Sequence, residues 1–160
     1  MGQKEAWRRT VIAGLVLMMA ATVAPGMALA RGSVCAQSKE LAALQARVLQ
    51  TELMVGALTC GQNERYNAFV TSYKGDLVNY GKTIRALFQR AYGGGAKHKL
   101  NKFVTKLAND SSQRSNSARQ GYCILAAQLF DEASATPKRS IIELTDKPWI
   151  RSKHGFQPCN

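Results

Sequence analysis

The chain has 160 residues, and its 22 Lys and Arg residues against 10 Asp and Glu residues give a formal net charge of +12. That length suits one modest domain. An apolar content of 46% excludes a disordered or low-complexity chain. After the N-terminal segment there is no apolar run of about 20 residues, which excludes a polytopic membrane protein. No motif in the sequence identifies a reaction.

Residues 1–30 have the pattern of a cleaved secretory signal peptide. Lys4, Arg8 and Arg9 form a positive start, residues 11–23 are almost wholly apolar, and an Ala-Leu-Ala cleavage site follows. The apolar run is shorter than the roughly 20 residues of a membrane span, which argues against an uncleaved anchor. We therefore expect export to the bacterial periplasm or secretion, by a general or a twin-arginine route. Cleavage would lower the net charge from +12 to +10.

All four cysteines lie after the expected cleavage site, at Cys35, Cys60, Cys123 and Cys159. An even number of cysteines in a small exported domain predicts two disulfides. Their spacing contains no C-x-x-C pair, so the sequence lacks the signatures of zinc binding, redox catalysis and haem attachment.

Two long segments show the apolar spacing of helices. In residues 37–60, leucine and valine recur at helical intervals, and Gly61 follows at the position of a helix stop. In residues 64–92 an apolar and aromatic stripe continues for about eight turns, with Gly75 and Gly81 as points where the helix could bend. We predict one helix in each segment.

Two shorter helices are predicted after the glycine triplet at residues 93–95. Apolar residues within 100–109 indicate a third, shorter helix, and residues 118–133 indicate a fourth that ends before Pro137. The polar residues 111–117 between them could be a loop or the first helical turns of the fourth helix.

The expected fold is all-α. Short connectors make neighbouring helices pack antiparallel, so residues 31–136 are predicted to form a small antiparallel four-helix bundle. Residues 137–160 contain prolines and lone aromatic residues, and we expect them to form an irregular, extended tail that packs on the bundle and is held by Cys159.

The rise per residue of an α-helix suggests which cysteines pair. A short third helix would return the chain only part of the way, and Cys123 would then lie near the start of the first helix. This geometry favours Cys35–Cys123 and Cys60–Cys159, although four cysteines allow three connectivities.

The segment from Leu77 to Asn109 contains seven basic residues, one histidine and no acidic residue. Rows of like charge repel one another, which favours an anionic partner such as an envelope lipid, an envelope polysaccharide or an acidic protein. The alternative is a solvated face that only maintains solubility. Nucleic acid is not expected, because export removes the chain from the genome and no aromatic platform interleaves the lysines. The candidate binding residues, predicted to project to water from two helices, are Lys82, Arg85, Lys99, Lys102 and Lys106.

Glu52 lies in apolar surroundings, before Leu53, Met54 and Val55. A carboxyl group in such a setting can act as a general acid, as in enzymes that cut glycosidic bonds, although that reaction usually needs a second carboxylate. The structural interpretation is that Glu52 pairs with an Arg or a Tyr of a neighbouring helix.

Metal, cofactor and nucleotide sites are not expected. His98 and His154 have no further ligand at a metal-binding spacing. The serines of residues 111–117 lack the context of a nucleophile elbow, and the glycine triplet lacks the Lys-Ser ending of a phosphate loop.

The sequence thus supports three hypotheses. The first is an exported, non-catalytic helical protein that binds an anionic envelope component or an acidic protein through its basic face. The second is an envelope-polymer hydrolase with Glu52 as general acid. The third is a structural or assembly protein that oligomerises through an apolar face.

Overall fold

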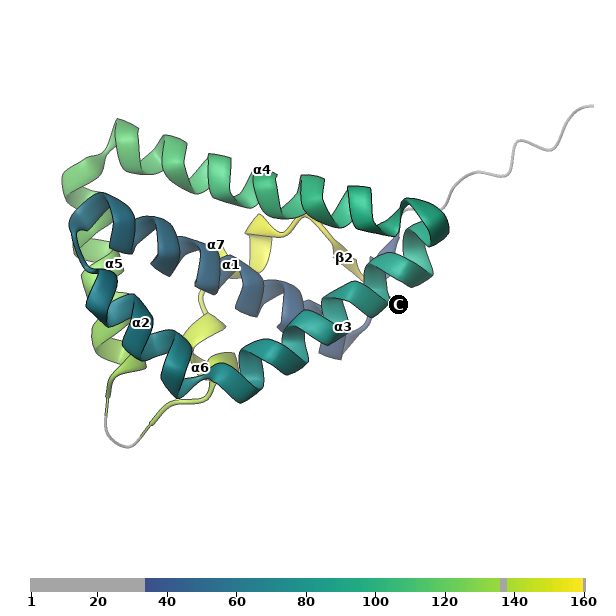
Figure 1. Ribbon diagram of the computed structural model, residues 1–160, viewed down its shortest axis with the longest axis horizontal. Helices are drawn as coiled ribbons and strands as arrows, with labels where there is room; N and C mark the ends of the chain where they lie inside the picture. Colours follow the sequence, from purple (N-terminus) through teal and green to yellow (C-terminus); the bar gives the residue numbers. More distant parts are fainter. Residues whose placement is uncertain (1–33, 136–137, 160) are drawn as a thin grey trace, which may run out of the picture. The chain divides into compact units, whose positions relative to one another are not determined.

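The computed structural model describes residues 34–135 and 138–159 (Figure 1). The expected signal peptide at residues 1–30 lies outside the described residues. In chain order the elements are β1 (Cys35–Ala36), α1 (Ser38–Cys60), α2 (Asn63–Ser72), α3 (Lys74–Tyr92), the 3-10 helix η1 (Gly93–Gly95), α4 (Ala96–Ser117), α5 (Arg119–Ala133), α6 (Ile141–Thr145), α7 (Pro148–Lys153) and β2 (Gln157–Pro158).

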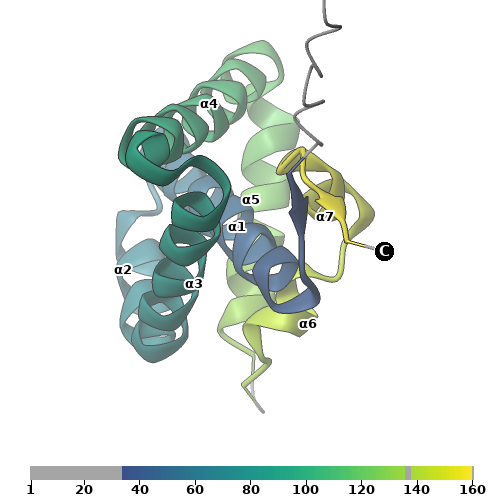
Figure 2. The ribbon, with the colours of Figure 1, turned by 90° about the vertical axis from the view of Figure 1, so that its right-hand side faces the viewer.

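Helix α1 is the central element and contacts every other described α-helix (Figure 2). It begins with a capping box, in which the Gln37 N–H donates to the Glu40 carboxylate at 2.8 Å. Gly61 follows its last residue, and the φ of 70° at Gly61 is the left-handed conformation in which many helices end. The all-α prediction is confirmed, but the antiparallel four-helix bundle is not, because the other helices surround α1 rather than form three equivalent neighbours.

The helix predicted over residues 64–92 is divided at Tyr73 into α2 and α3. The Tyr73 side chain is buried, and its hydroxyl donates to the carbonyl oxygens of Ala133 and Arg139, at 3.2 and 2.8 Å. These bonds hold the bend against α5 and the segment after it. The bend lies two residues before Gly75, one of the two glycines at which bending was expected.

Helix α4 is longer than the third helix that the sequence predicts, because the polar residues 111–117 form its last turns. Two of these serines are buried against α1 with hydrogen-bond partners there: Ser111 donates to Glu52 at 2.8 Å, and Ser115 accepts from Thr59 at 3.3 Å. Since polar groups on the buried face are satisfied, the helix continues through a stretch without apolar residues.

The length of α4 also explains why the predicted cysteine pairing is wrong. The disulfides join Cys35 to Cys159 and Cys60 to Cys123. A helix of 22 residues rises about 33 Å, so α4 carries the chain back to the C-terminal end of α1, where Cys123 meets Cys60. The tail then returns to the start of α1 and Cys35.

Residues 138–159 are more helical than the extended tail that the sequence predicts. Ser140 caps α6 by accepting from the Glu143 N–H, and Ile141 and Ile150 place the apolar sides of α6 and α7 in the core. The segment ends in β2, which pairs in parallel with β1 beside the Cys35–Cys159 disulfide. The expectation that Cys159 holds the tail is therefore confirmed.

The buried apolar residues form two clusters that follow each other along α1. One contains Leu49, Leu53 and Phe130, and the other contains Leu44 and Leu87. Among the described helices, none has the length and apolar character needed to cross a membrane.

Candidate functional site

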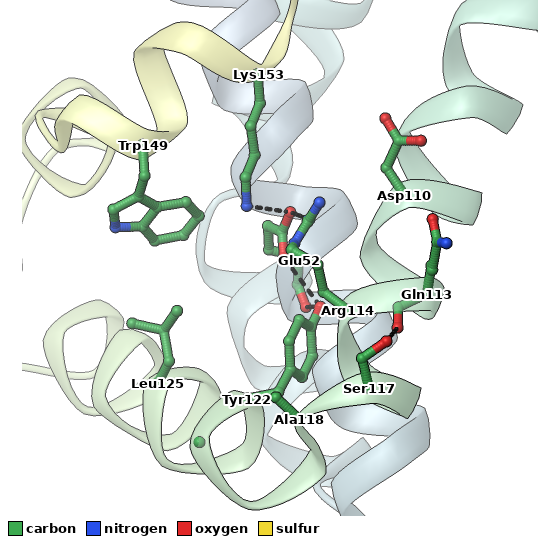
Figure 3. Close-up of a pocket in the computed structure, with 11 residues that line it drawn as sticks. Glu52, Asp110, Gln113, Arg114, Ser117, Ala118, Tyr122, Leu125, Trp149 and Lys153 are labelled. Carbon is green, nitrogen blue, oxygen red and sulfur yellow. Dashed lines mark hydrogen bonds and ion pairs between the residues drawn. The ribbon is translucent and has the colours of Figure 1, made fainter.

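Glu52 lies at the point where three other helices approach the middle of α1. Its side chain is buried, with 4% of the residue exposed. Oε1 accepts hydrogen bonds from Lys153 Nζ at 3.0 Å and from Arg114 Nη2 (Figure 3). It also accepts one from Ser111 Oγ at 2.8 Å. Oε2 accepts from the Tyr122 hydroxyl at 3.0 Å. The expectation that Glu52 pairs with an Arg or a Tyr of a neighbouring helix is confirmed for both residue types.

Two local features of the sequence bring α4 and α5 to Glu52. On α4, Ser111 and Arg114 are three residues apart and share one face, and they are joined by a hydrogen bond of 3.0 Å. On α1, Gly56 allows α5 to approach closely, because a Cβ there would lie 2.7 Å from the Cβ of Ala126. That close approach places the Tyr122 hydroxyl over the Glu52 carboxylate.

A cavity of about 700 Å³ opens above this carboxylate, between α4, α5 and α7. Trp149, Leu125 and the ring of Tyr122 form an apolar wall, while Arg114, Gln113 and Ser117 lie on the α4 side (Figure 3). The Lys153 ammonium lies between the two sides, 4.3 Å from the centre of the Trp149 ring. The volume is in the range of small-molecule sites, which combine apolar walls with a few polar groups.

Both cations in the cavity have hydrogen-bond donors to spare. Lys153 has three N–H donors and uses one on Glu52. Arg114 uses Nη2 on Glu52 and Ser111, and within the described structure its Nη1 and Nε donate to no protein group. Their side chains are 40% (Arg114) and 23% (Lys153) exposed, so the remaining donors are accessible. The floor of the cavity can therefore take a further anionic group.

Burial perturbs the titrating groups at the cavity floor. It lowers the pKa of the Lys153 ammonium, and the neighbouring Glu52 carboxylate opposes that change. Burial and the Glu52 charge together raise the pKa of the Tyr122 hydroxyl well above its ordinary value. Near neutral pH, Tyr122 is therefore a neutral donor.

The five predicted binding cations are all exposed, as expected, but they do not converge on one site. Lys82 lines a depression between the start of α1 and α3, whereas Lys102 and Lys106 line another along α4. Lys106 forms an ion pair with Asp110, the first acidic residue after the basic segment. Lys99 lies over the ring of Tyr92, at 5.9 Å from its centre.

Glu52 can be singled out from the sequence, but the residues that make its surroundings a pocket cannot. These are Arg114, Tyr122, Trp149 and Lys153. The spacing of Ser111 and Arg114 was a usable signal, but it became visible only once residues 111–117 proved to be helical. Lys153 and Trp149 belong to a segment expected to be extended, in which no shared face could be assigned.

The two histidines do not gather further ligands. His154 is buried, and its Nδ1 accepts the Phe156 N–H at 3.1 Å, whereas His98 is exposed on α4. Within residues 34–135 and 138–159, no group of three His, Cys, Asp or Glu side chains is placed to hold a metal ion.

Comparison of the chain with protein families, with curated proteins and with solved structures found no match.

Proposed function

We propose that this chain is an exported, non-catalytic binding protein whose ligand is an anion with an apolar body, held in the cavity above Glu52. Two disulfides within one small domain support an oxidising compartment such as the periplasm or the exterior of the cell. The ligand class keeps the anionic partner expected from the net charge but moves the site from the basic face to the cavity.

The observation that carries this proposal is the pair of underused cations beneath an apolar wall. Arg114 and Lys153 bring two positive charges to the floor, and Glu52 supplies one negative charge against them. A ligand carboxylate or phosphate group would accept hydrogen bonds from the remaining N–H groups and balance the excess positive charge. Trp149 and Leu125 would contact the apolar body of the same molecule.

The hydrogen bonding of Glu52 favours binding over acid catalysis. A general acid carries a proton on an oxygen that faces its substrate. Here both oxygens of Glu52 accept from protein donors, so neither is free to present a proton to a substrate. Asp110 also lines the cavity, so the hydrolase hypothesis has a second carboxylate, but Asp110 is paired with Lys106. Turnover of an envelope polymer that is lost in Glu52→Gln would favour the hydrolase.

The exposed basic residues are proposed to attract anionic molecules in general. Lys82, Arg85, Lys99, Lys102 and Lys106 face solvent. Their field would raise the local concentration of anionic lipid, polysaccharide or acidic protein without providing a shaped site. Retention on an anionic surface would then depend on salt concentration, while binding in the cavity would depend on the shape of the ligand.

Trp149 offers a direct test of the cavity. It is the only tryptophan after residue 30. In the exported form, residues 31–160, its fluorescence therefore reports on the cavity wall. We would titrate that form with dodecanoate and with the uncharged dodecanol below their aggregation concentrations. Dodecanoate is expected to bind about tenfold or more tightly, because its carboxylate meets two cations.

Two cavity variants and one control complete the experiment. Arg114→Gln and Lys153→Gln should each remove most of the preference for dodecanoate. Arg151→Gln is the matched control, because Arg151 lies on the same helix as Lys153 but pairs with Asp146 at the surface. Equal binding of the acid and the alcohol, or loss of the preference in the control alone, would contradict the proposal.

A further inference from the structure

Two guanidinium groups meet over Gly81, on the side of α1 that packs against α3. Arg47 projects from α1, and Arg85 lies one helical turn after Gly81 on α3. The position that a Cβ would take at Gly81 is 3.6 Å from Arg85 Nη1 and 4.0 Å from Arg47 Nη2. Nitrogen atoms of both cations therefore lie within 4.0 Å of one point, and the glycine leaves that point empty of side-chain atoms.

Within the described part of the chain, neither cation has an acidic partner. Among residues 34–135 and 138–159, the ion pairs involve neither Arg47 nor Arg85. Arg47 donates one side-chain hydrogen bond, from Nη1 to Gln50 Oε1 at 2.9 Å, and Nη2 and Nε donate to no described group. Arg85 donates to no described group. Two like charges close to the same point repel each other, and an anion between them would offset that repulsion.

The setting of Arg47 increases the cost of leaving this charge without a counter-ion. Its side chain is partly buried between α1 and α3. Burial lowers the pKa of Arg47; the nearby Tyr66 opposes this effect, and the charge of Arg85 adds to it. A partly desolvated cation is ordinarily paired with an anionic group, and the described residues supply none here.

We infer that Arg47 and Arg85 form a binding site for a tetrahedral oxyanion, a phosphate or sulfate group, over Gly81. A guanidinium group presents N–H donors in a planar fork that matches the oxygens of such an anion. Two forks from different helices can donate to different oxygens of one phosphate. The site is distinct from the proposed cavity, because neither arginine lines it.

Gly81 has a specific part in this site. A methyl group at that position would make ordinary van der Waals contacts with both guanidinium groups, so the helix can accept alanine there. The methyl would, however, lie against both guanidinium groups and narrow the room left for an anion between them. Gly81→Ala therefore crowds the site while keeping both charges, which a substitution of either arginine cannot do.

The test is a calorimetric titration of the exported form with inorganic phosphate, at an ionic strength kept constant with sodium chloride. Arg85→Gln should weaken phosphate binding by about tenfold or more, because it removes charge-assisted hydrogen bonds to the anion. Gly81→Ala should also weaken phosphate binding, because its methyl group crowds the anion while both charges remain. Arg85 is exposed and Gly81 tolerates a methyl, so neither variant should unfold the protein. Arg151→Gln, which removes an exposed arginine elsewhere, should bind phosphate as the unmodified protein does.

Two further measurements identify the source of the anion and distinguish this site from the cavity. Glycerol 3-phosphate is titrated beside inorganic phosphate: preference for the ester indicates the phosphate of a lipid or polymer, and equal binding indicates the free ion. Because the cavity floor can also take a phosphate group, the titration is repeated in Arg114→Gln, in which the binding that Arg85→Gln and Gly81→Ala weaken should persist. Unaltered binding in Arg85→Gln and Gly81→Ala, or loss of binding in Arg114→Gln instead, would overturn the inference without affecting the proposal for the cavity.

Discussion

Replacing Glu52 by glutamine should destabilise the protein by about 3 kcal/mol at pH 7. The amide keeps the shape and an acceptor oxygen but removes the charge that Arg114 and Lys153 share. Removing one partner of a fully buried ion pair costs roughly 3–5 kcal/mol, because a buried charge is left uncompensated. The cations here are 40% and 23% exposed, so water recovers part of that loss and the estimate belongs at the lower end. For a domain stable by about 5–15 kcal/mol, the effect is large.

Urea denaturation with the disulfides intact measures this loss, and Glu132→Gln is the matched control. Glu132 also pairs with one arginine and one lysine, Arg139 and Lys147, but it is more exposed than Glu52. Surface pairs contribute about 0–1 kcal/mol, so the control should lose no more than about 1 kcal/mol. If the two variants lose the same free energy, within about 0.5 kcal/mol, Glu52 is not the anchor of a buried network and the reasoning fails.

Three further predictions concern pH, packing and charge. Burial holds the pKa of folded His154 below its ordinary 6.5, so the unfolded chain binds more protons as pH falls through that window. Stability should therefore be full above pH 6.5 and decline on acidification. A protonated Nδ1 also cannot accept the hydrogen bond from the Phe156 N–H. The urea midpoint should therefore fall between pH 7 and 5, and this pH dependence should be smaller in His154→Gln. Gly56→Ala should cost about 1–3 kcal/mol in urea denaturation because its methyl would overlap Ala126, and adding Ala126→Gly should restore most of it. Sedimentation with anionic vesicles should show binding that weakens steeply as the salt concentration rises. Reversing the charge of the exposed residues Lys99, Lys102 and Lys106 should abolish this binding without changing the melting temperature. Binding that does not depend on salt would contradict the role of the basic face.

The sequence was most informative where burial repeats at helical spacing. The apolar stripe in residues 37–60 predicted α1 to within a residue, and the same stripe identified Glu52 as a polar residue in apolar surroundings. The bend at Tyr73 was harder to place, because it depends on hydroxyl contacts with Ala133 and Arg139, far along the chain. Local periodicity contains no information about such a partner.

The error over residues 111–117 affected both the disulfides and the pocket. An apolar stripe is the main signal of an amphipathic helix, and this stretch buries Ser111 and Ser115 instead. Their hydroxyl groups are satisfied by Glu52 and Thr59 on α1, so the polar face packs as an apolar face would. With the helix cut short, Cys123 was placed at the wrong end of α1, and Arg114 could not be assigned to the same face as Ser111.

The observed disulfides connect directly with the proposed cavity. Cys123 follows Tyr122 in α5, and its bridge to Cys60 ties that part of α5 to the end of α1. Cys159 ends the segment that carries α7, and its bridge to Cys35 ties that segment to the other end of the same helix.

Of the three helices around the cavity, α5 is therefore cross-linked to the end of α1, and the segment that carries α7 is cross-linked to the strand just before α1. The bridges span 63 and 124 residues, and in the chain-entropy model loops of that length stabilise the folded state by about 4–5 kcal/mol each. Because the disulfides already hold these segments in place, a ligand does not have to order them when it binds. More of its interaction energy therefore appears as affinity. For the same reason, reduction of the Cys35–Cys159 bridge should weaken dodecanoate binding while the helical content changes little. The helix concerned, α7, supplies Trp149 and Lys153 to the cavity but has only six residues.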